Sequence, residues 1–213
     1  AGVPGFAHAT GDVLPLLDQR GIRQAAVLGM SQGARIALDL AQRAPGRVGA
    51  LLLDGAPAVE GLPGGPWPPE TPLEHYRQRL ATDGLESLRA ELAALAFFQL
   101  RSREPAARRT LEAMLARYTG ADLADPAAAR APRAVGLSRL RLPVLVLNGE
   151  HDTAQRLAIG AALAGAIPGA RQRTIAGAGH LACLDEPAAY ARIVTDFLRE
   201  HAFIPSTSGT ETP

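Results

Sequence analysis

The chain has 213 residues, of which 47% are hydrophobic, and a formal net charge of +1. This length suffices for a full hydrophobic core, and the near-neutral charge gives no electrostatic reason to expect a nucleic acid or a membrane surface as partner. All 22 basic residues are arginine, which excludes chemistry that needs lysine, such as a Schiff base or a Walker-type phosphate loop. The single cysteine, Cys183, excludes an internal disulfide framework, and no apolar run of the sequence approaches the ~20 residues of a bilayer span, so we expect a cytoplasmic protein.

The spacing of apolar residues predicts strands that alternate with helices in the first and last parts of the chain. A short helix is expected from Asp12 to Arg20, because its apolar residues recur at helical spacing and Gly21 follows. Such alternation is typical of an α/β fold with a mostly parallel sheet flanked by helices. The other expected strands and helices are, in chain order, strand 25–29, helix 33–44, strand 48–54, strand 142–148, helix 154–166, strand 171–175 and helix 187–201.

A long segment between the second and third strands interrupts this alternation. It opens with a stretch rich in proline and glycine at 61–69, and continues with leucines at helical spacing over 85–95 and apolar residues over 111–118. We expect a helical lid that covers a pocket at the carboxyl ends of the strands, where open α/β sheets bind ligands. The expected division is a core of residues 1–55 and 133–202, a helical lid of residues 56–132, and a disordered tail of residues 203–213.

Ser31 stands between two glycines, in the pattern G-x-S-x-G, where the strand 25–29 turns into the helix 33–44. A turn this tight strains the serine backbone, and Gly29 and Gly33 remove the Cβ atoms that would collide there. The hydroxyl is then lifted clear of the strand, and the amide of Gln32 is placed to stabilise an oxyanion. The alternative is an ordinary serine in a glycine-containing loop, so the interpretation depends on a base and an acid elsewhere in the chain.

The later strands are followed by loops that offer such an acid and base. Asp152 follows the third strand and His180 follows the fourth, so both emerge at the sheet edge that presents Ser31. The chain order serine, aspartate, histidine is the order of one class of catalytic triads. His151 is a less suitable base, because it adjoins Asp152 and could not easily face it. Asp54, after the second strand, is a competing acid, although a turn residue before glycine is the favoured interpretation.

Taken together, these residues resemble the α/β-hydrolase family over nearly the whole chain. The resemblance lies in the serine turn 29–33, the acid loop 149–152, and the histidine loop 177–180 with its Asp-Glu-Pro at 185–187. The chain is most similar to the bacterial branch of 3-oxoadipate enol-lactonases and esterases. Serine at position 31 argues against the dehalogenase and epoxide-hydrolase branches, which use an aspartate. Family members begin with further strands and a His-Gly loop that donates the second oxyanion amide, and nothing in residues 1–24 resembles that region.

The resemblance implies a serine hydrolase that acts on a small carboxylic ester, lactone or thioester through an acyl-enzyme. Ser31 would attack the carbonyl carbon, His180 would move the proton and Asp152 would orient His180, with no metal or cofactor. The same triad could instead hydrolyse a C–C bond or act as a perhydrolase. The residues expected to line the substrate pocket are Met30, Trp67, Phe97 and Phe98, although the two phenylalanines fit ordinary packing within the lid equally well.

A third interpretation is a non-catalytic fragment that needs a partner segment. The strand 25–29 would have one unpaired side if its expected upstream neighbours are absent, and its side chains are strongly apolar. Such an edge tends to pair with another chain. We therefore expect either self-association through strand 25–29 or a complementing N-terminal segment, with no nucleic acid and no membrane as partner.

Overall fold

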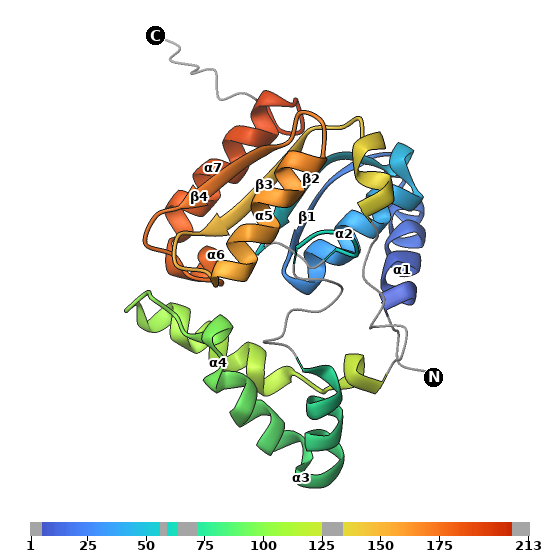
Figure 1. Ribbon diagram of the computed structural model, residues 1–213. Helices are drawn as coiled ribbons and strands as arrows, with labels where there is room; N and C mark the ends of the chain where they lie inside the picture. The colour runs from blue at the N-terminus through green and yellow to red at the C-terminus, as the bar shows by residue number, and fades with distance from the viewer. Residues whose placement is uncertain (1–5, 56–58, 64–71, 125–133, 206–213) are drawn as a thin grey trace.

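The computed structural model describes residues 6–55, 59–63, 72–124 and 134–205, and its strands form one parallel sheet (Figure 1). Each adjacent pair of strands runs in parallel, in the order β1-β2-β3-β4. The predicted α/β class is therefore confirmed, and each predicted strand is present. The strands are β1 (Ala25–Met30), β2 (Val48–Asp54), β3 (Val144–Gly149) and β4 (Arg171–Ile175).

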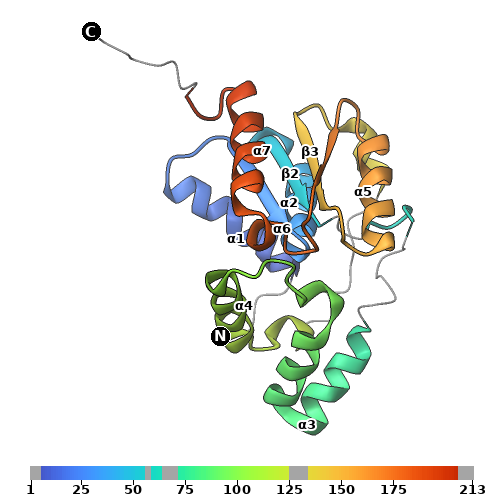
Figure 2. The same ribbon diagram turned by 90° about the vertical axis from the view of Figure 1, so that its left-hand side faces the viewer.

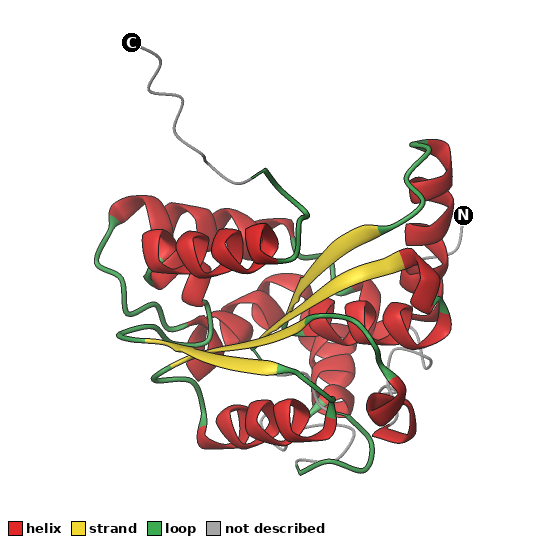
Figure 3. Cartoon of the chain, turned by 90° about the horizontal axis from the view of Figure 1, so that it is seen from above, coloured by secondary structure: helices red, strands yellow, loops and turns green. Residues whose placement is uncertain are grey.

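Helices cover both faces of this sheet, as Figures 2 and 3 show. The first helix starts before the predicted Asp12 and contains Pro15. A short helix that the sequence analysis did not foresee, α6 (Ala182–Asp185), follows the histidine loop. That first helix is α1 (Phe6–Gln19), and the remaining helices of the core lie close to their predicted bounds: α2 (Gln32–Arg43), α5 (Ala154–Ala166) and α7 (Pro187–Glu200).

The two central strands are buried on both faces because their side chains alternate between two hydrophobic clusters. Leu51 and Leu53 of β2 pack with α2 and α5 on one face. Leu52 of β2 and Leu147 of β3 pack on the other face with Phe197 of α7. A continuous apolar run is what a parallel strand covered by helices on both sides requires. Polar residues come instead at the carboxyl ends of these strands, with Asp54 at the end of β2 and Asn148 near the end of β3.

Two long helices lie between β2 and β3 in the chain, α3 (Leu73–Ala94) and α4 (Pro105–Arg117). The first is kinked at Gly84, whose backbone is not helical. Tyr76, Leu88 and Leu123 form the centre of a hydrophobic cluster separate from those of the sheet. Figure 1 shows α3 and α4 beyond the ends of the strands. Ser31 directly follows the carboxyl end of β1. Residues 96–98, which include the two predicted pocket phenylalanines, form the 3₁₀ turn η2.

Two predictions fall partly or wholly outside the described residues. Trp67 lies outside them, and so does most of the predicted tail, from residue 206 onward. Phe203, which we assigned to the tail, packs against the cluster formed by β2, β3 and α7, so the ordered core extends past residue 202. Its ring lies against Gly49, where a side chain would collide with it. Within the described part of the chain, no helix is long and apolar enough to cross a membrane.

Strand β1 lies at one edge of the sheet formed by the described strands. Its partner on one side is β2, with Leu28 opposite Leu52. Leu52 is 1% exposed, whereas Leu28 is 42% exposed although it is a large apolar residue in a strand. The face of β1 that bears Leu28 is therefore less covered than the equivalent face of β2.

Candidate active site

Ser31 is held in a strained backbone conformation between β1 and α2. Its φ is 49° and its ψ is −112°, a region that costs a non-glycine residue about 1–3 kcal/mol. Its amide donates a hydrogen bond of 2.7 Å to the carbonyl oxygen of Asp54, which fixes the turn to the end of β2. Strain of this kind at a strand-to-helix turn is a reason to look for function, because the surrounding fold must stabilise it.

The two glycines of the G-x-S-x-G pattern have different roles. A Cβ atom at Gly29 would lie 2.2 Å from the carbonyl oxygen of Gly33, so only glycine lets α2 begin this close to β1. At Gly33, by contrast, no atom lies within 4 Å of a Cβ position, and the backbone needs no positive φ. The prediction that both glycines relieve collisions is right for Gly29 and wrong for Gly33. Gly33 instead lines the cavity described below.

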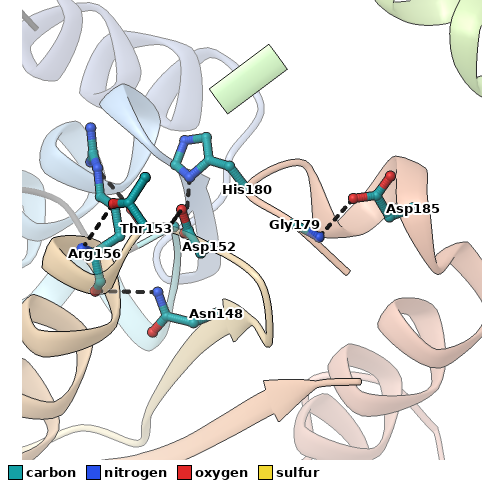
Figure 4. Close-up of polar contacts among 8 residues, drawn as sticks. Asn148, Asp152, Thr153, Arg156, Gly179, His180 and Asp185 are labelled. Carbon is teal, nitrogen blue, oxygen red and sulfur yellow. Dashed lines mark hydrogen bonds and ion pairs between the residues drawn. The ribbon is translucent and has the colours of Figure 1, made fainter. Parts of the chain in front are cut away.

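His180 and Asp152 form a buried hydrogen-bonded pair (Figure 4). The ring Nδ1 lies 3.0 Å from Oδ2 of Asp152, and the two residues are 6% and 7% exposed. The other carboxylate oxygen accepts a bond of 2.8 Å from the amide of Thr153, the residue that caps α5. With Nδ1 directed at the carboxylate, Nε2 is the nitrogen left for proton transfer. The ring lies over Gly55, where a Cβ would come within 2.8 Å of Cε1.

The other candidate base and acid, His151 and Asp54, do not form the buried histidine–aspartate pair. The His151 side chain is 42% exposed and lies 3.7 Å from Glu150. Asp54 is fully buried at the end of β2, but the hydrogen bond from His180 goes to Asp152. Burial raises the pKa of the Cys183 thiol, in agreement with a packing role. Between Ser31 and His180, which line the same cavity, the described structure contains no hydrogen bond; such contacts often tighten only when substrate is bound.

Burial raises the pKa of the Asp54 carboxyl from its ordinary 3.8 to about 6. The Tyr190 hydroxyl and the nearby His180 partly oppose this effect, and Asp152 adds to it. Neither carboxyl oxygen has a hydrogen-bond partner of ordinary geometry among the described residues. A buried carboxyl with so few partners favours its neutral form. Asp54 therefore holds a proton at a pH where an exposed aspartate has lost it.

Asp185 is a buried structural acid that the sequence analysis noted only as part of a motif. Its carboxylate accepts bonds from the amides of Gly179 at 2.7 Å, Arg101 at 2.7 Å and Ser102 at 2.9 Å. The first of these amides belongs to the loop that carries His180, and the other two follow η2. Asp185 thus joins the histidine loop to the segment between β2 and β3. The sequence offers one weak signal for this role, which is that Asp185 lies close to the histidine loop along the chain.

A cavity of about 420 Å³ lies between the carboxyl edge of the sheet and the inserted helices. Ser31 and His180 line it, as do Gln32 and three of the predicted pocket residues, Met30, Phe97 and Phe98. Phe97 packs against His180, with ring centroids 5.1 Å apart. Most of the remaining wall is formed by apolar side chains of α3 and α4. Two lining residues that the sequence analysis did not select are Arg35 and Arg156.

Comparison with known proteins places the chain in a family. The sequence model that describes the alpha/beta hydrolase fold matches residues 6–187, which is most of the chain. The chain belongs to the α/β-hydrolase family. A curated member of the family, the 2-hydroxy-6-oxononadienedioate/2-hydroxy-6-oxononatrienedioate hydrolase 2 of Pseudomonas putida, is 27% identical over 189 residues. The match covers 86% of this chain but only 66% of that relative, so the chain spans just under two thirds of its length.

Solved structures of family members share the same arrangement. The enol-lactonase from Burkholderia xenovorans superposes with a TM-score of 0.74 and is 27% identical, with 93% of this chain and 75% of that chain covered. A hydrolase from Pseudomonas aeruginosa gives a TM-score of 0.75 at 28% identity, with 92% and 73% covered. MenH from S. aureus gives 0.80 at 19% identity, with 93% and 76% covered, and at that identity the likeness concerns the fold alone.

Proposed function

We propose that this member of the α/β-hydrolase family is a serine hydrolase of small carboxylic esters, lactones or thioesters, with Ser31, His180 and Asp152 as its catalytic residues. The observation that carries the proposal is the strained backbone of Ser31 on the wall of the cavity that also contains His180. The bond of 3.0 Å between His180 and Asp152 supports the assignment of base and acid. The similarity to an enol-lactonase supports the choice of substrate class.

The proposed reaction proceeds through an acyl-enzyme. The Ser31 Oγ attacks the carbonyl carbon while Nε2 of His180 accepts the hydroxyl proton, and the Gln32 amide donates a hydrogen bond to the developing oxyanion. His180 then gives its proton to the leaving oxygen or sulfur, which departs and leaves the acyl group on Ser31. A water molecule, deprotonated by His180, attacks this ester; the bond between the acyl carbon and the Ser31 Oγ breaks, His180 returns the proton to Oγ, and the acid product leaves. Asp152 keeps the imidazole in the required tautomer throughout.

A fluorophosphonate probe tests the nucleophile, because it reacts with activated serines only. The probe should label the wild-type chain and the control variant Ser138→Ala, which changes an exposed serine of the turn η5 (Ala134–Arg139). Ser31→Ala should abolish labelling. Labelling that persists in Ser31→Ala would exclude Ser31 as the nucleophile.

A second candidate is hydrolysis of a C–C bond by the same three residues. The relative from Pseudomonas putida favours it, because its name denotes an oxo-dicarboxylate and not an ester. A panel of assays would separate these activities. Ester hydrolysis is measured with p-nitrophenyl esters and lactones, C–C bond hydrolysis with a vinylogous diketone acid, and perhydrolase activity by the formation of a peracid. Ester turnover at least as fast as C–C cleavage would support the first candidate.

We further propose that the outer edge of β1 pairs with another strand, either from a second copy or from a complementing segment. The support is the place of β1 at the edge of the described sheet and the 42% exposure of Leu28. An unpaired apolar edge promotes association. Sedimentation of the chain alone should show self-association that Leu28→Glu reduces. A monomer with ester turnover typical of a complete hydrolase would contradict the proposal.

A further inference from the structure

Two buried arginines stand out on the wall of the cavity. Arg35 is 5% exposed and Arg156 is 6% exposed, and both line the cavity that contains Ser31 and His180. Removing a guanidinium from water is costly, so two of them on one wall form a strongly positive surface. Of the other described residues on this wall, Asp122 is the acidic one, and it accepts a hydrogen bond of 3.4 Å from Nε2 of Gln32.

The two arginines are close enough to repel each other. Burial and, to a smaller extent, the charge of Arg156 lower the pKa of Arg35 to about 10, although Asp39 on the same helix opposes the change. At neutral pH Arg35 therefore remains charged in spite of its neighbour. A wall with two positive charges and one negative charge attracts an anion, and the attraction is strong because the surroundings are apolar.

The positive charges lie at the catalytic end of the cavity. Arg35 is one helical turn beyond Ser31 on α2. Arg156 extends from α5, and its Nη1 donates a bond of 3.3 Å to the carbonyl oxygen of Gly55. Its guanidinium lies 5.0 Å from the centre of the Phe97 ring, the ring that packs against His180. The wall formed by α3 and α4 is, in contrast, largely apolar.

We infer that the substrate carries a carboxylate close to its scissile carbonyl, and that Arg35 and Arg156 bind this carboxylate. The inference rests on the proposed function for the position of the scissile carbonyl. A guanidinium matches a carboxylate with two parallel N–H···O bonds, which is why arginine is used where such a group must be oriented. The rest of the substrate would lie against the apolar side chains of the inserted helices. The inferred substrate is therefore a short ester or lactone that also carries a free carboxylate.

The first experiment compares two esters of nearly equal shape, mono-p-nitrophenyl glutarate and p-nitrophenyl 5-methylhexanoate, in which a branched alkyl end replaces the carboxylate. Wild-type protein should prefer the charged ester in kcat/KM by at least about tenfold. Arg35→Gln and Arg156→Gln should each reduce this ratio at least about tenfold, Arg35→Lys should retain part of it, and the exposed control Arg192→Gln should leave it unchanged. The ratio does not depend on the fraction of folded enzyme. No preference in wild type, or a preference that survives both Gln variants, overturns the inference.

The second experiment needs no catalysis. Calorimetric titration of wild-type protein with hexanoate and with hexanamide should show tighter binding of hexanoate by at least about tenfold, and both Gln variants should remove the difference. Equal binding of the two ligands overturns the inference even if esters are hydrolysed. If no ester is hydrolysed while hexanoate binding depends on both arginines, the proposed function fails and the carboxylate site stands.

Discussion

The replacement Asp54→Asn tests whether the buried carboxyl of Asp54 lowers the stability of this protein near neutral pH, where it must lose its proton. Asp54 is fully buried, and the pKa of its carboxyl is raised from 3.8 to about 6. The difference between these values corresponds to about 3 kcal/mol. Below pH 3.8 the carboxyl is protonated in the folded and unfolded states, so it costs nothing. As the pH rises toward 6, only the folded state keeps the proton, and the free energy of unfolding falls; above pH 6 the full cost of a buried carboxylate applies.

Urea unfolding of wild type and Asp54→Asn at several pH values between 4 and 8 measures this cost. The amide cannot ionise, so its advantage over the wild type should be about 2 kcal/mol larger at pH 8 than at pH 4, where the unfolded wild type has already lost part of its protons. Comparing the two pH values cancels any pH-independent cost of burying an amide near Tyr190. The control Asp196→Asn changes an exposed aspartate of α7, whose side chain is 62% exposed, and should show a difference within about 0.5 kcal/mol. An Asp54→Asn advantage that is equal at pH 4 and pH 8 would refute the reasoning.

Substitutions at three further positions, with comparison variants for two of them, test the construction of the site. Asp152→Asn should lower kcat by up to about 10⁴-fold, the loss seen in a serine protease triad, and near-normal turnover would exclude Asp152 as the triad acid. Gly29→Ala should lower the free energy of unfolding by about 1–3 kcal/mol, because the new Cβ would lie 2.2 Å from a backbone oxygen of α2. Gly165→Ala, on an exposed part of α5 with no atom within 4 Å, should instead raise it by up to about 1 kcal/mol in the same urea titration. Asp185→Ala should cost at least about 3 kcal/mol in thermal unfolding, since it removes the acceptor of three amides, whereas Asp185→Asn should retain part of that stability; equal loss in both variants would argue against the hydrogen bonds as the cause.

The parts of the fold that the sequence predicts well are those set by local spacing. Strands β2 and β3 are short buried apolar runs, and Ser31, Asp152 and His180 are recognisable because each lies in the turn or loop that follows a predicted strand. Arg35 and Arg156 were not selected, because a charged residue in an amphipathic helix normally faces solvent. Only the tertiary structure shows that these two positions face the cavity.

Contacts between distant segments were also beyond the sequence analysis. The amide of Ser102 binds the carboxylate of Asp185, 83 residues further along the chain, and no pattern in either segment indicates the pairing. Phe203 follows the last helix and resembles the start of a polar tail, yet its ring packs against Gly49, which is small enough to admit it. The role of Gly33 was misjudged for a related reason, because the room around a Cβ depends on packing and not on the motif.

The anchoring of the inserted helices at Asp185 has a consequence for how a ligand enters the cavity. Arg101 and Ser102 are tied to this carboxylate, and the Arg101 side chain also donates a bond of 3.1 Å to the carbonyl oxygen of Gly177. On this side the insertion cannot separate from the histidine loop and α6 without breaking three hydrogen bonds at once. An opening motion is therefore expected to pivot about this point, with α3 moving most. Such a hinge would admit a ligand from the far side while the surroundings of His180 keep their geometry.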